Sequence, residues 1–479
     1  MAGNQVTGRV TWLRDTLQRS RKEAFASALM TGTCDNYLGA FAIALRASLV
    51  QMSWLTAAPQ LIGALSQLLS VWLCQHLHRK KAIVIGVGVQ ATAVLCMMLL
   101  ALYTPDNAVL WLIGAAVVYH ASANFVQPQW RGWMGSVVPA RRRGAYFAGR
   151  TRLTMITTLA VFAGGGALLG AFDERGEVYI GFALIFAVAT LGRALSARQL
   201  ARMHDPDPHS GPPVDLAGTL RRIRDAFRHR TFRRYTLFVA GMQGAVAVSA
   251  PFFSVYMLRD LDYSYWQFSI NTGASILTQF FTLAIWGRLC DQWGNRFVMI
   301  ASSSILPLVP ALWLFSSNYY YLILVQVVSG LAWGGFTLST ANYLYDLRPP
   351  RADFASYAAV QSALSAIGIF CGALVGGLLA RHLDVLLLAM PPSLAPAHAL
   401  LLIMLVSSLL RLLIVAWFIP HSEELRVRRR PDLLRVVYRI SRFTPGAGVV
   451  LDWLTVTRAE RAASQDMRQE ESSVKSTEE

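Results

Sequence analysis

The chain has 479 residues, of which 54% are hydrophobic and only 15% charged, and its mean hydropathy is +0.41. A soluble protein normally carries about 25% charged residues. The charges lie in short segments between long apolar runs. This pattern excludes a soluble globular protein and indicates a chain that crosses a membrane many times.

Twelve apolar runs follow one another along the chain, each close to the ~20 residues that a helix needs to cross the hydrocarbon layer. Apolar and polar residues do not alternate within them, which excludes membrane-spanning strands. The sequence therefore predicts an all-α membrane protein with twelve transmembrane helices. The predicted spans are 25–45, 54–75, 82–103, 109–131, 151–171, 178–198, 235–257, 266–287, 296–316, 319–342, 355–380 and 398–419.

Lys and Arg are distributed unequally between the two sides of the membrane. If the N-terminus lies inside, the outer loops hold only four of the 44 basic residues, namely Arg46, Arg175, Arg259 and Arg381. This asymmetry follows the positive-inside rule and places both termini in the cytoplasm. It also explains the net charge of +17 without nucleic-acid binding. The excess of Arg over Lys favours a bacterial inner membrane, as does the absence of N-glycosylation sequons from the outer loops.

Residues 199–234 separate the first six spans from the last six. This segment contains the stretch D-P-D-P-H-S-G-P-P, whose Pro and Gly content is typical of a linker. Three cytoplasmic segments combine basic residues with apolar residues at helical spacing. They are predicted to lie on anionic lipids or to pack against the cytoplasmic face of the protein. The predicted domains are an amphipathic segment 1–22, a six-helix bundle 23–198, the linker 199–234, a second six-helix bundle 235–420 and a cytoplasmic tail 421–479.

The two groups of spans share traces of an internal repeat. Four residues of the first half recur in the second half at a constant offset, which together with the equal span counts indicates a duplication. The first set is Pro139, Tyr146, Gly165 and Gly166, and the second is Pro350, Tyr357, Gly376 and Gly377.

The stretch G-R-L-C-D-Q-W-G-N-R follows the eighth predicted span, at residues 287–296. Gly287 permits close helix approach and Gly294 permits a tight turn. Asp291 can accept hydrogen bonds from the amides of a neighbouring helix N-terminus, and Arg296 adds positive charge on the inner side. The stretch resembles the signature of the major facilitator superfamily, which lies between the second and third helices of each half.

The first half departs from this signature. In the stretch V-W-L-C-Q-H-L-H-R-K at 71–80, Arg79 fits, but Gln75 and His78 stand where the family pattern has Asp and Gly. The usual charged contact of the first half is therefore in doubt.

Two further stretches resemble the same family. Residues 138–150, with Arg143 and Gly144, are similar to the basic connection between its fourth and fifth helices. Residues 250–261 are similar to the end of its seventh helix. The resemblance implies two six-helix bundles around a central cavity lined by helices one, four, seven and ten. It further implies a secondary transporter of a small organic solute that works by alternating access, with proton or sodium coupling as one option, and we expect a monomer.

Two ionisable residues lie at the middle of predicted cavity helices, where a charge is costly. Asp35 is in the first span and His120 in the fourth. A carboxyl group beside a neutral imidazole is a plausible arrangement for proton coupling. The alternative is that Asp35 only fixes helix packing through hydrogen bonds, and that His120 is a buried imidazole bound to one carbonyl.

Further polar and aromatic residues of the cavity helices are candidates for solute binding, because small-molecule sites combine apolar walls with a few directed polar groups. Ordinary helix packing is the alternative for each aromatic residue. Arg131 and Arg411 are gate or anion candidates that can instead extend to the membrane interface. The binding candidates are Asn36, Tyr37, Asn124, Gln127, Gln243, Phe252, Tyr256, Gln326, Trp333 and Phe336.

Two other function classes stay open at this point. A membrane enzyme acting on lipid-linked substrates would need clustered acidic or His residues, and the longest outer loop, 381–397, offers only His382 and Asp384. A sensor or scaffold that has lost transport would explain the altered first signature. The chain has no P-loop or zinc-protease motif, and its five cysteines lie in or beside spans, so we expect no enzyme activity, cofactor, metal or disulfide.

Overall fold

The computed structural model describes residues 2–73, 78–138, 143–205, 224, 227–347, 354–383, 385 and 398–422. Within these ranges every regular element is helical, as expected where backbone groups must be satisfied without water. The first half contains α1 (Ala2–Met30), η1 (Thr31–Asp35), α2 (Asn36–Ala44), α3 (Leu49–Leu73), α4 (Arg79–Tyr103), α5 (Ala108–Val137), α6 (Arg143–Asp173) and α7 (Val178–Arg202). The second contains α9 (Arg230–Val255), η3 (Tyr256–Asp260), α10 (Tyr265–Trp293), α11 (Asn295–Ile305), α12 (Leu308–Leu312), α13 (Tyr319–Leu347), α14 (Phe354–Arg381) and α16 (Leu400–His421).

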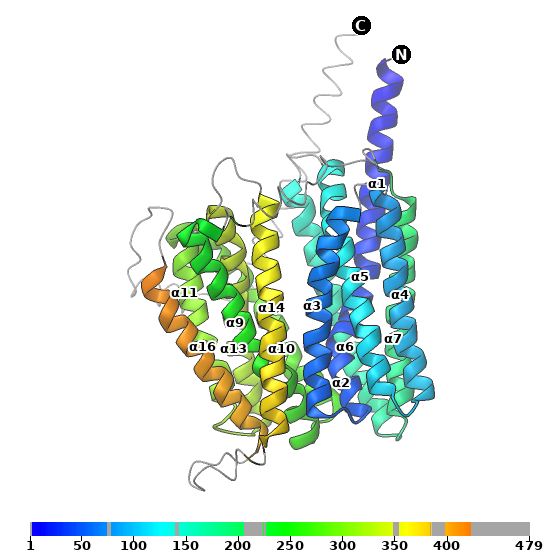
Figure 1. The fold of residues 1–479 in the computed structure, drawn as a ribbon. Helices are drawn as coiled ribbons and strands as arrows, with labels where there is room; N and C mark the ends of the chain where they lie inside the picture. The colour runs from blue at the N-terminus through cyan, green and yellow to red at the C-terminus, as the bar shows by residue number, and fades with distance from the viewer. Residues whose placement is uncertain are drawn as a thin grey trace.

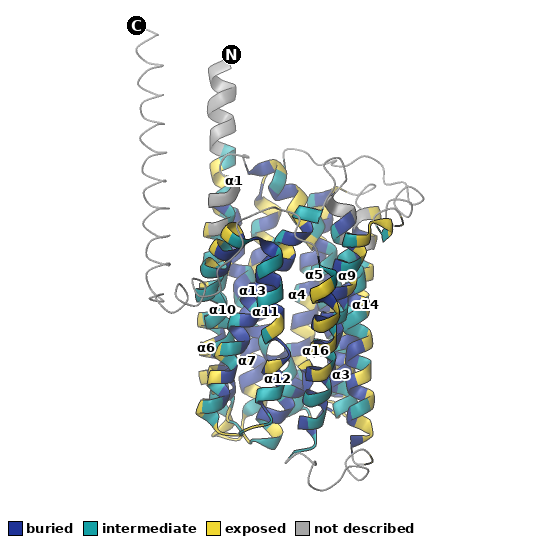
Figure 2. Cartoon of the chain, turned by 90° about the vertical axis from the view of Figure 1, so that its left-hand side faces the viewer, coloured by how far each residue is buried: buried dark blue, intermediate teal, exposed yellow. Residues whose placement is uncertain are grey.

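The predicted spans correspond one by one to these helices, so the twelve-helix membrane fold is confirmed. In the described part of the chain, ten helices are long and apolar enough to cross a membrane by length and composition. Large apolar side chains such as Leu191, Leu324 and Leu413 point outward with more than half of their surface exposed, as lipid-facing residues do. Figure 2 shows the buried residues gathered between the helices and the exposed ones on the outside.

Three spans are not single α-helices. The first and seventh contain the π-helical turns η1 and η3, and the ninth is broken between α11 and α12 at Pro307, which has no backbone N–H to continue the helix. The predicted N-terminal segment 1–22 continues without a break into the first span, because α1 runs from Ala2 to Met30. Most of the linker and nearly all of the tail 421–479 lie outside the described residues.

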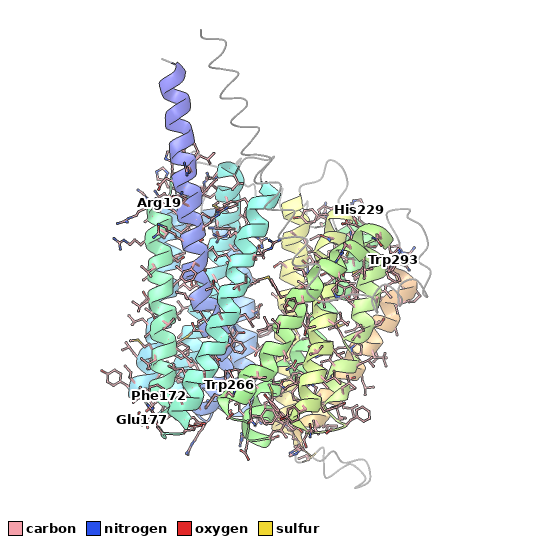
Figure 3. The ribbon with its side chains drawn as sticks, turned by 180° about the vertical axis from the view of Figure 1, so that it is seen from behind. Arg19, Phe172, Glu177, His229, Trp266 and Trp293 are labelled. Atoms are coloured by element: carbon pink, nitrogen blue, oxygen red, sulfur yellow. The ribbon has the colours of Figure 1, made fainter. Side chains whose placement is uncertain are left out.

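The helices form two bundles that stand side by side, α1 to α7 in one and α9 to α16 in the other (Figure 1). The bundles meet where α3 packs along α14 and where α6 packs along α10. Figure 3 identifies the two ends of the molecule. Arg19, His229 and Trp293 mark the face from which α1 enters, called here the N-terminal face, and Phe172, Glu177 and Trp266 mark the opposite face.

The contacts between the bundles repeat in the two halves. A Cβ on Gly166 of α6 would collide with Ser269 of α10, and a Cβ on Gly377 of α14 would come within 2.8 Å of Ser53 of α3. Each glycine thus lets its helix approach the second helix of the opposite half. The duplication predicted from these glycines is therefore present in the fold.

The hydrophobic core is shared at one face and divided at the other. Toward the opposite face, a single buried cluster includes Phe41 and Met52 from the first half and Phe252 and Trp313 from the second. Toward the N-terminal face, the buried clusters of the described residues each belong to one half only. Among the described residues, the cores of the two halves are therefore joined at the opposite face, called here the sealed face, and separate at the N-terminal face.

Candidate functional site

A cavity of about 280 Å³ lies among the helices of the first half. Its walls come from α1, η1, α4, α5, α6 and α7, and every residue that lines it belongs to the first half. The lining residues are Glu23, Ser27, Met30, Thr31, Asp35, Val87, Gln90, Tyr119, His120, Ala123, Val126, Gln127, Trp130, Arg150, Arg193 and Leu200.

Asp35 ends the π-helical turn η1 and is exposed to this cavity. The hydroxyl of Tyr119 donates a hydrogen bond of 2.6 Å to its carboxylate. The neighbouring Asn36 donates from its side-chain amide to the carbonyls of Thr31 and Gly32, at 3.2 and 3.3 Å. A π turn leaves carbonyls without their usual helical partners, so Asn36 stabilises the turn that carries Asp35.

Glu23, Arg150 and Arg193 are the other charged residues of the cavity, and the first two of them form an ion pair. The Arg150 guanidinium lies 2.7 Å from the Glu23 carboxylate and stacks over the Trp130 ring at 4.5 Å. Arg193 donates to the hydroxyl of Ser27 at 3.2 Å. The interior of the first half therefore holds two carboxylates, two guanidinium groups and an imidazole around one space.

Arg193 and Glu23 are also connected through a serine. The hydroxyl of Ser196 accepts a bond of 3.3 Å from Arg193 and donates one of 3.1 Å to the Glu23 carboxylate. Both charged side chains are buried, with 6% and 3% of their surface exposed. They are also close enough to interact electrostatically, and the field of Arg193 reaches Asp35 as well.

The sequence does not single out Glu23, Arg150 and Arg193 as site residues, because each lies near the end of a predicted span, where a charged side chain can reach the membrane interface. A signal for Glu23 was present in the polar stripe of α1. Ser20, Glu23, Ser27, Thr31 and Asp35 follow one another at spacings of three and four residues, which places them on one side of a helix.

Of the candidates in the fourth span, His120 and Gln127 line this cavity, and His120 lies close enough to Asp35 to interact with it electrostatically. Asn124 has a packing role: its amide donates to the His120 carbonyl at 2.9 Å and lies against Gly63 of α3. Tyr37 faces the other bundle, donating to the Phe162 carbonyl at 2.5 Å and sharing a hydrogen bond of 2.8 Å with Ser269. Tyr37 therefore links the two halves near the sealed face.

The candidates of the second half do not reach this cavity. Phe252, Tyr256 and Phe336 are packed in the core, each with at most 1% of its surface exposed. Trp333 lies beside Phe336, with their ring centroids 5.9 Å apart. The two polar candidates of this half are Gln326 and Gln243. Gln326 donates a hydrogen bond of 3.0 Å to Asn271, and Gln243 is half-buried on α9.

Arg411 is buried within the second bundle and does not extend to the interface. It donates to the Leu306 carbonyl at 3.1 Å and to the Ser249 hydroxyl at 3.0 Å. Leu306 precedes the break between α11 and α12, and Ser408 of α16 bonds the next carbonyl, that of Pro307, at 2.6 Å. Arg411 and Ser408 therefore satisfy carbonyls that the broken helix leaves open.

The signature residues of the second half lie at the N-terminal face. Gly294 has a φ of +92°, so the predicted tight turn is confirmed. A Cβ on Gly287 would meet Leu338 at 3.9 Å, an ordinary contact, so the predicted close helix approach at Gly287 is wrong. Asp291 is exposed on a polar cavity of about 240 Å³ beside Asp346, and it makes no ion pair with the described residues.

Arg79 and Arg296, one in each signature stretch, both bind a residue just beyond the last helix of their own half. Arg79 binds the carboxylate of Asp205 through two nitrogens, and Arg296 donates to the Ser422 hydroxyl at 2.9 Å. The partners are separated by 126 residues along the chain in both cases. Arg131 is exposed within the last two turns of α5, whereas the side chain of Arg143 and the surroundings of Gly144 lie outside the described residues.

Comparison with known proteins identifies the architecture. The family model described as Major Facilitator Superfamily matches residues 24–256 and 236–443. No curated protein sequence is significantly similar to the chain.

Solved transporters share the fold at low sequence identity. A variant of the nucleoside transporter NupG is 13% identical with a TM-score of 0.65, covering 85% of this chain and 100% of its own. A bacterial homolog of the human lysosomal transporter Spinster, solved inward-facing and occupied, is 13% identical with a TM-score of 0.61, covering 86% and 96%. A POT family transporter in complex with 5-aminolevulinic acid is 13% identical with a TM-score of 0.60, covering 86% and 96%. With the family model matched over most of its length and two related six-helix bundles in its fold, the chain belongs to the Major Facilitator Superfamily and is a secondary transporter.

Proposed function

We propose that this transporter moves a small organic solute and couples the movement to protons through Asp35. The observation that carries the proposal is the setting of this carboxyl group, which is exposed to a cavity inside the membrane and bonded to the neutral hydroxyl of Tyr119. A carboxylate at membrane depth costs about 2.5–3.5 kcal/mol on insertion scales, so it must be hydrated, paired or protonated. A change from a hydrated to a closed cavity would therefore favour uptake of a proton.

The cavity chemistry supports a polar solute that carries charge. The side chains of Trp130 and Tyr119 supply flat apolar surface, and Arg193, Asp35 and His120 supply directed polar groups. If Asp35 is protonated, Arg193 and the ion pair of Glu23 with Arg150 leave one net positive charge. A solute with an anionic group would then complete the charge balance, and proton and solute would move together.

The orientation follows from the basic residues that gather at the N-terminal face. We infer that this face is cytoplasmic, that both termini and the 199–234 linker lie there, and that the membrane is a bacterial inner membrane. The separated cores at this face then correspond to an inward-open state. A reporter active only in the cytoplasm should work when inserted at residue 210 and fail at residue 390. The reverse pattern would overturn the orientation.

The remaining organisation is proposed on the same grounds. The bundles 23–198 and 235–420 are the two moving units, and the basic segments beside them contact anionic lipids. We infer that the monomer is the working unit, because the cavity is complete within one chain. No chemical reaction is assigned to the chain.

The test of coupling compares Asp35→Asn with Asp106→Asn, which removes an exposed carboxylate from the loop before α5. In proteoliposomes, a solute that the unmodified protein accumulates should still exchange through Asp35→Asn. Its accumulation under a pH gradient should disappear, whereas Asp106→Asn should accumulate it normally. Accumulation by Asp35→Asn equal to that of the unmodified protein would remove Asp35 from the coupling step and leave His120 as the next candidate.

A further inference from the structure

A second polar cavity, of about 450 Å³, lies at the N-terminal face, apart from the site described above. It is formed where the N-terminal part of α1 meets the start of α4 and the end of α7. The ring of Trp12 on α1 lies 4.7 Å from the ring of His204, and the backbone amide of His204 donates to the Thr16 hydroxyl at 3.4 Å. The cavity is therefore a seam between α1 and the rest of the first bundle.

The charges around this seam are unbalanced. Lys80, Lys81 and Arg202 line it, Lys81 and Arg202 with exposed side chains, and none of the three forms an ion pair with the described residues. The two acidic residues of the lining are neutralised by other arginines, Asp15 by Arg19 at 2.7 Å and Asp205 by Arg79. The three basic side chains of the cavity therefore have no carboxylate partner among the described residues.

The start of α4 adds to this positive character. Its first turn, Arg79, Lys80 and Lys81, contains no acidic residue, and the N-cap residue His78 makes no capping hydrogen bond through its side chain. The amide groups of a first helical turn point out of the helix and favour an anion, and basic residues there are unfavourable unless an anion is bound.

His78 also explains part of the departure from the family signature. The corresponding residue in the second half, Gly294, has a φ of +92° that favours glycine, whereas His78 has a φ of −60°. The first half therefore does not need glycine at this turn, and the imidazole of His78 lines the cavity instead.

We propose that this seam binds an anionic phosphate group, held by Lys80 and Lys81 at the start of α4 and by Arg202 at the end of α7. The group can belong to the headgroup of an acidic phospholipid in the adjacent leaflet or to a free phosphate. The position of the seam at the membrane face, with Trp12 beside it, is typical of a headgroup site. The proposal does not depend on the transported solute or on Asp35.

The experiment uses the full chain in nanodiscs of phosphatidylcholine alone or mixed with phosphatidylglycerol. The variant Lys81→Ser/Arg202→Ser removes two exposed charges of the seam. The control Lys22→Ser/Arg198→Ser removes two exposed basic residues that do not line it. Native mass spectrometry then counts retained phosphatidylglycerol, and the thermal midpoint measures its stabilising effect.

We expect the affinity for phosphatidylglycerol to fall about thirtyfold in the seam variant, which corresponds to about 2 kcal/mol for two basic residues, and to fall much less in the control. A second arm adds inorganic phosphate to the protein in detergent at constant ionic strength. If phosphate raises the thermal midpoint of the unmodified protein but not that of the seam variant, while phosphatidylglycerol has no selective effect, the source is a free anion. The proposal is overturned if seam and control variants respond alike to both ligands, because the cavity then binds no specific anion.

Discussion

The glycine contacts between the bundles give the sharpest test of the sealed face. Gly166 of α6 lies directly against Ser269 of α10, which shares a hydrogen bond of 2.8 Å with Tyr37. In Gly166→Ala the new methyl group would overlap the Ser269 side chain and lie 3.2 Å from the Tyr37 hydroxyl. Overpacking of this kind costs about 1–3 kcal/mol, and separating the halves at this face would relieve it. The equilibrium constant between the present conformation and one in which the halves separate at this face should therefore shift by about 5- to 150-fold toward separation.

The change is measured by cysteine labelling. With the native cysteines replaced, Ser53→Cys places a thiol at the junction of the halves, where Ser53 is 1% exposed and contacts Gly377. Gly166→Ala should increase the rate at which a water-soluble maleimide labels this thiol. The control is Gly164→Ala on the same helix, because a Cβ at Gly164 meets no atom within 4 Å. Equal labelling rates in these two variants, with both proteins folded, would refute the account of the sealed face.

Four other substitutions test the contacts at the N-terminal face and at the π turn. Arg79→Ala leaves the buried Asp205 carboxylate without its ion pair and should lower the free energy of unfolding by about 3–5 kcal/mol. Arg296→Ala removes a hydrogen bond to a neutral hydroxyl and should lower it by about 1 kcal/mol. Similar decreases of the thermal midpoint in the two variants would contradict this difference. Asp291→Asn should change the free energy of unfolding by no more than about 0.5 kcal/mol, because Asp291 is exposed and makes no ion pair with the described residues. A marked loss of stability would reveal a partner of Asp291 in this state. Asn36→Ala should lower stability by about 1–2 kcal/mol, since two carbonyls of η1 lose their donor, and unchanged denaturation would show that water replaces it.

The helices could be predicted from the sequence because the bilayer imposes the same requirement on every span. A run of about twenty apolar residues can satisfy its backbone in lipid only as a helix, so composition alone located all twelve. The turn at Gly294 was equally predictable, because a glycine at that position of the signature implies a φ that other residues avoid. Both predictions depend on local chemistry.

The site was only partly predictable because it depends on which helix faces meet. Asp35, His120 and Gln127, which line the cavity, stand out in the sequence as polar residues within spans. The second-half aromatics were not separable from packing residues, since their helices are apolar on all sides and the sequence does not show which side faces the centre. Phe252 illustrates this, because it is fully buried in the apolar cluster that the two halves share.

The charged partners of the site were harder still to predict. Glu23 and Arg193 lie at depths where a side chain can either reach the interface or turn inward. Only the packing of α1 against α7 decides that both turn inward.

The π turns η1 and η3 lie in the first helix of each half, and they affect how these helices can move. A π turn holds one residue more than the α turn that it replaces, so the residues beyond it are rotated by about 100° relative to an uninterrupted helix. The π turn can shift along the helix by one turn. The segment of residues between its old and new positions would then rotate about the helix axis, while the helix on either side would stay in place. In η1 that segment would include Asp35, whose carboxyl group would swing away from Tyr119. The first helix therefore has a way to reorient one side chain by a screw motion that needs no displacement of the whole bundle.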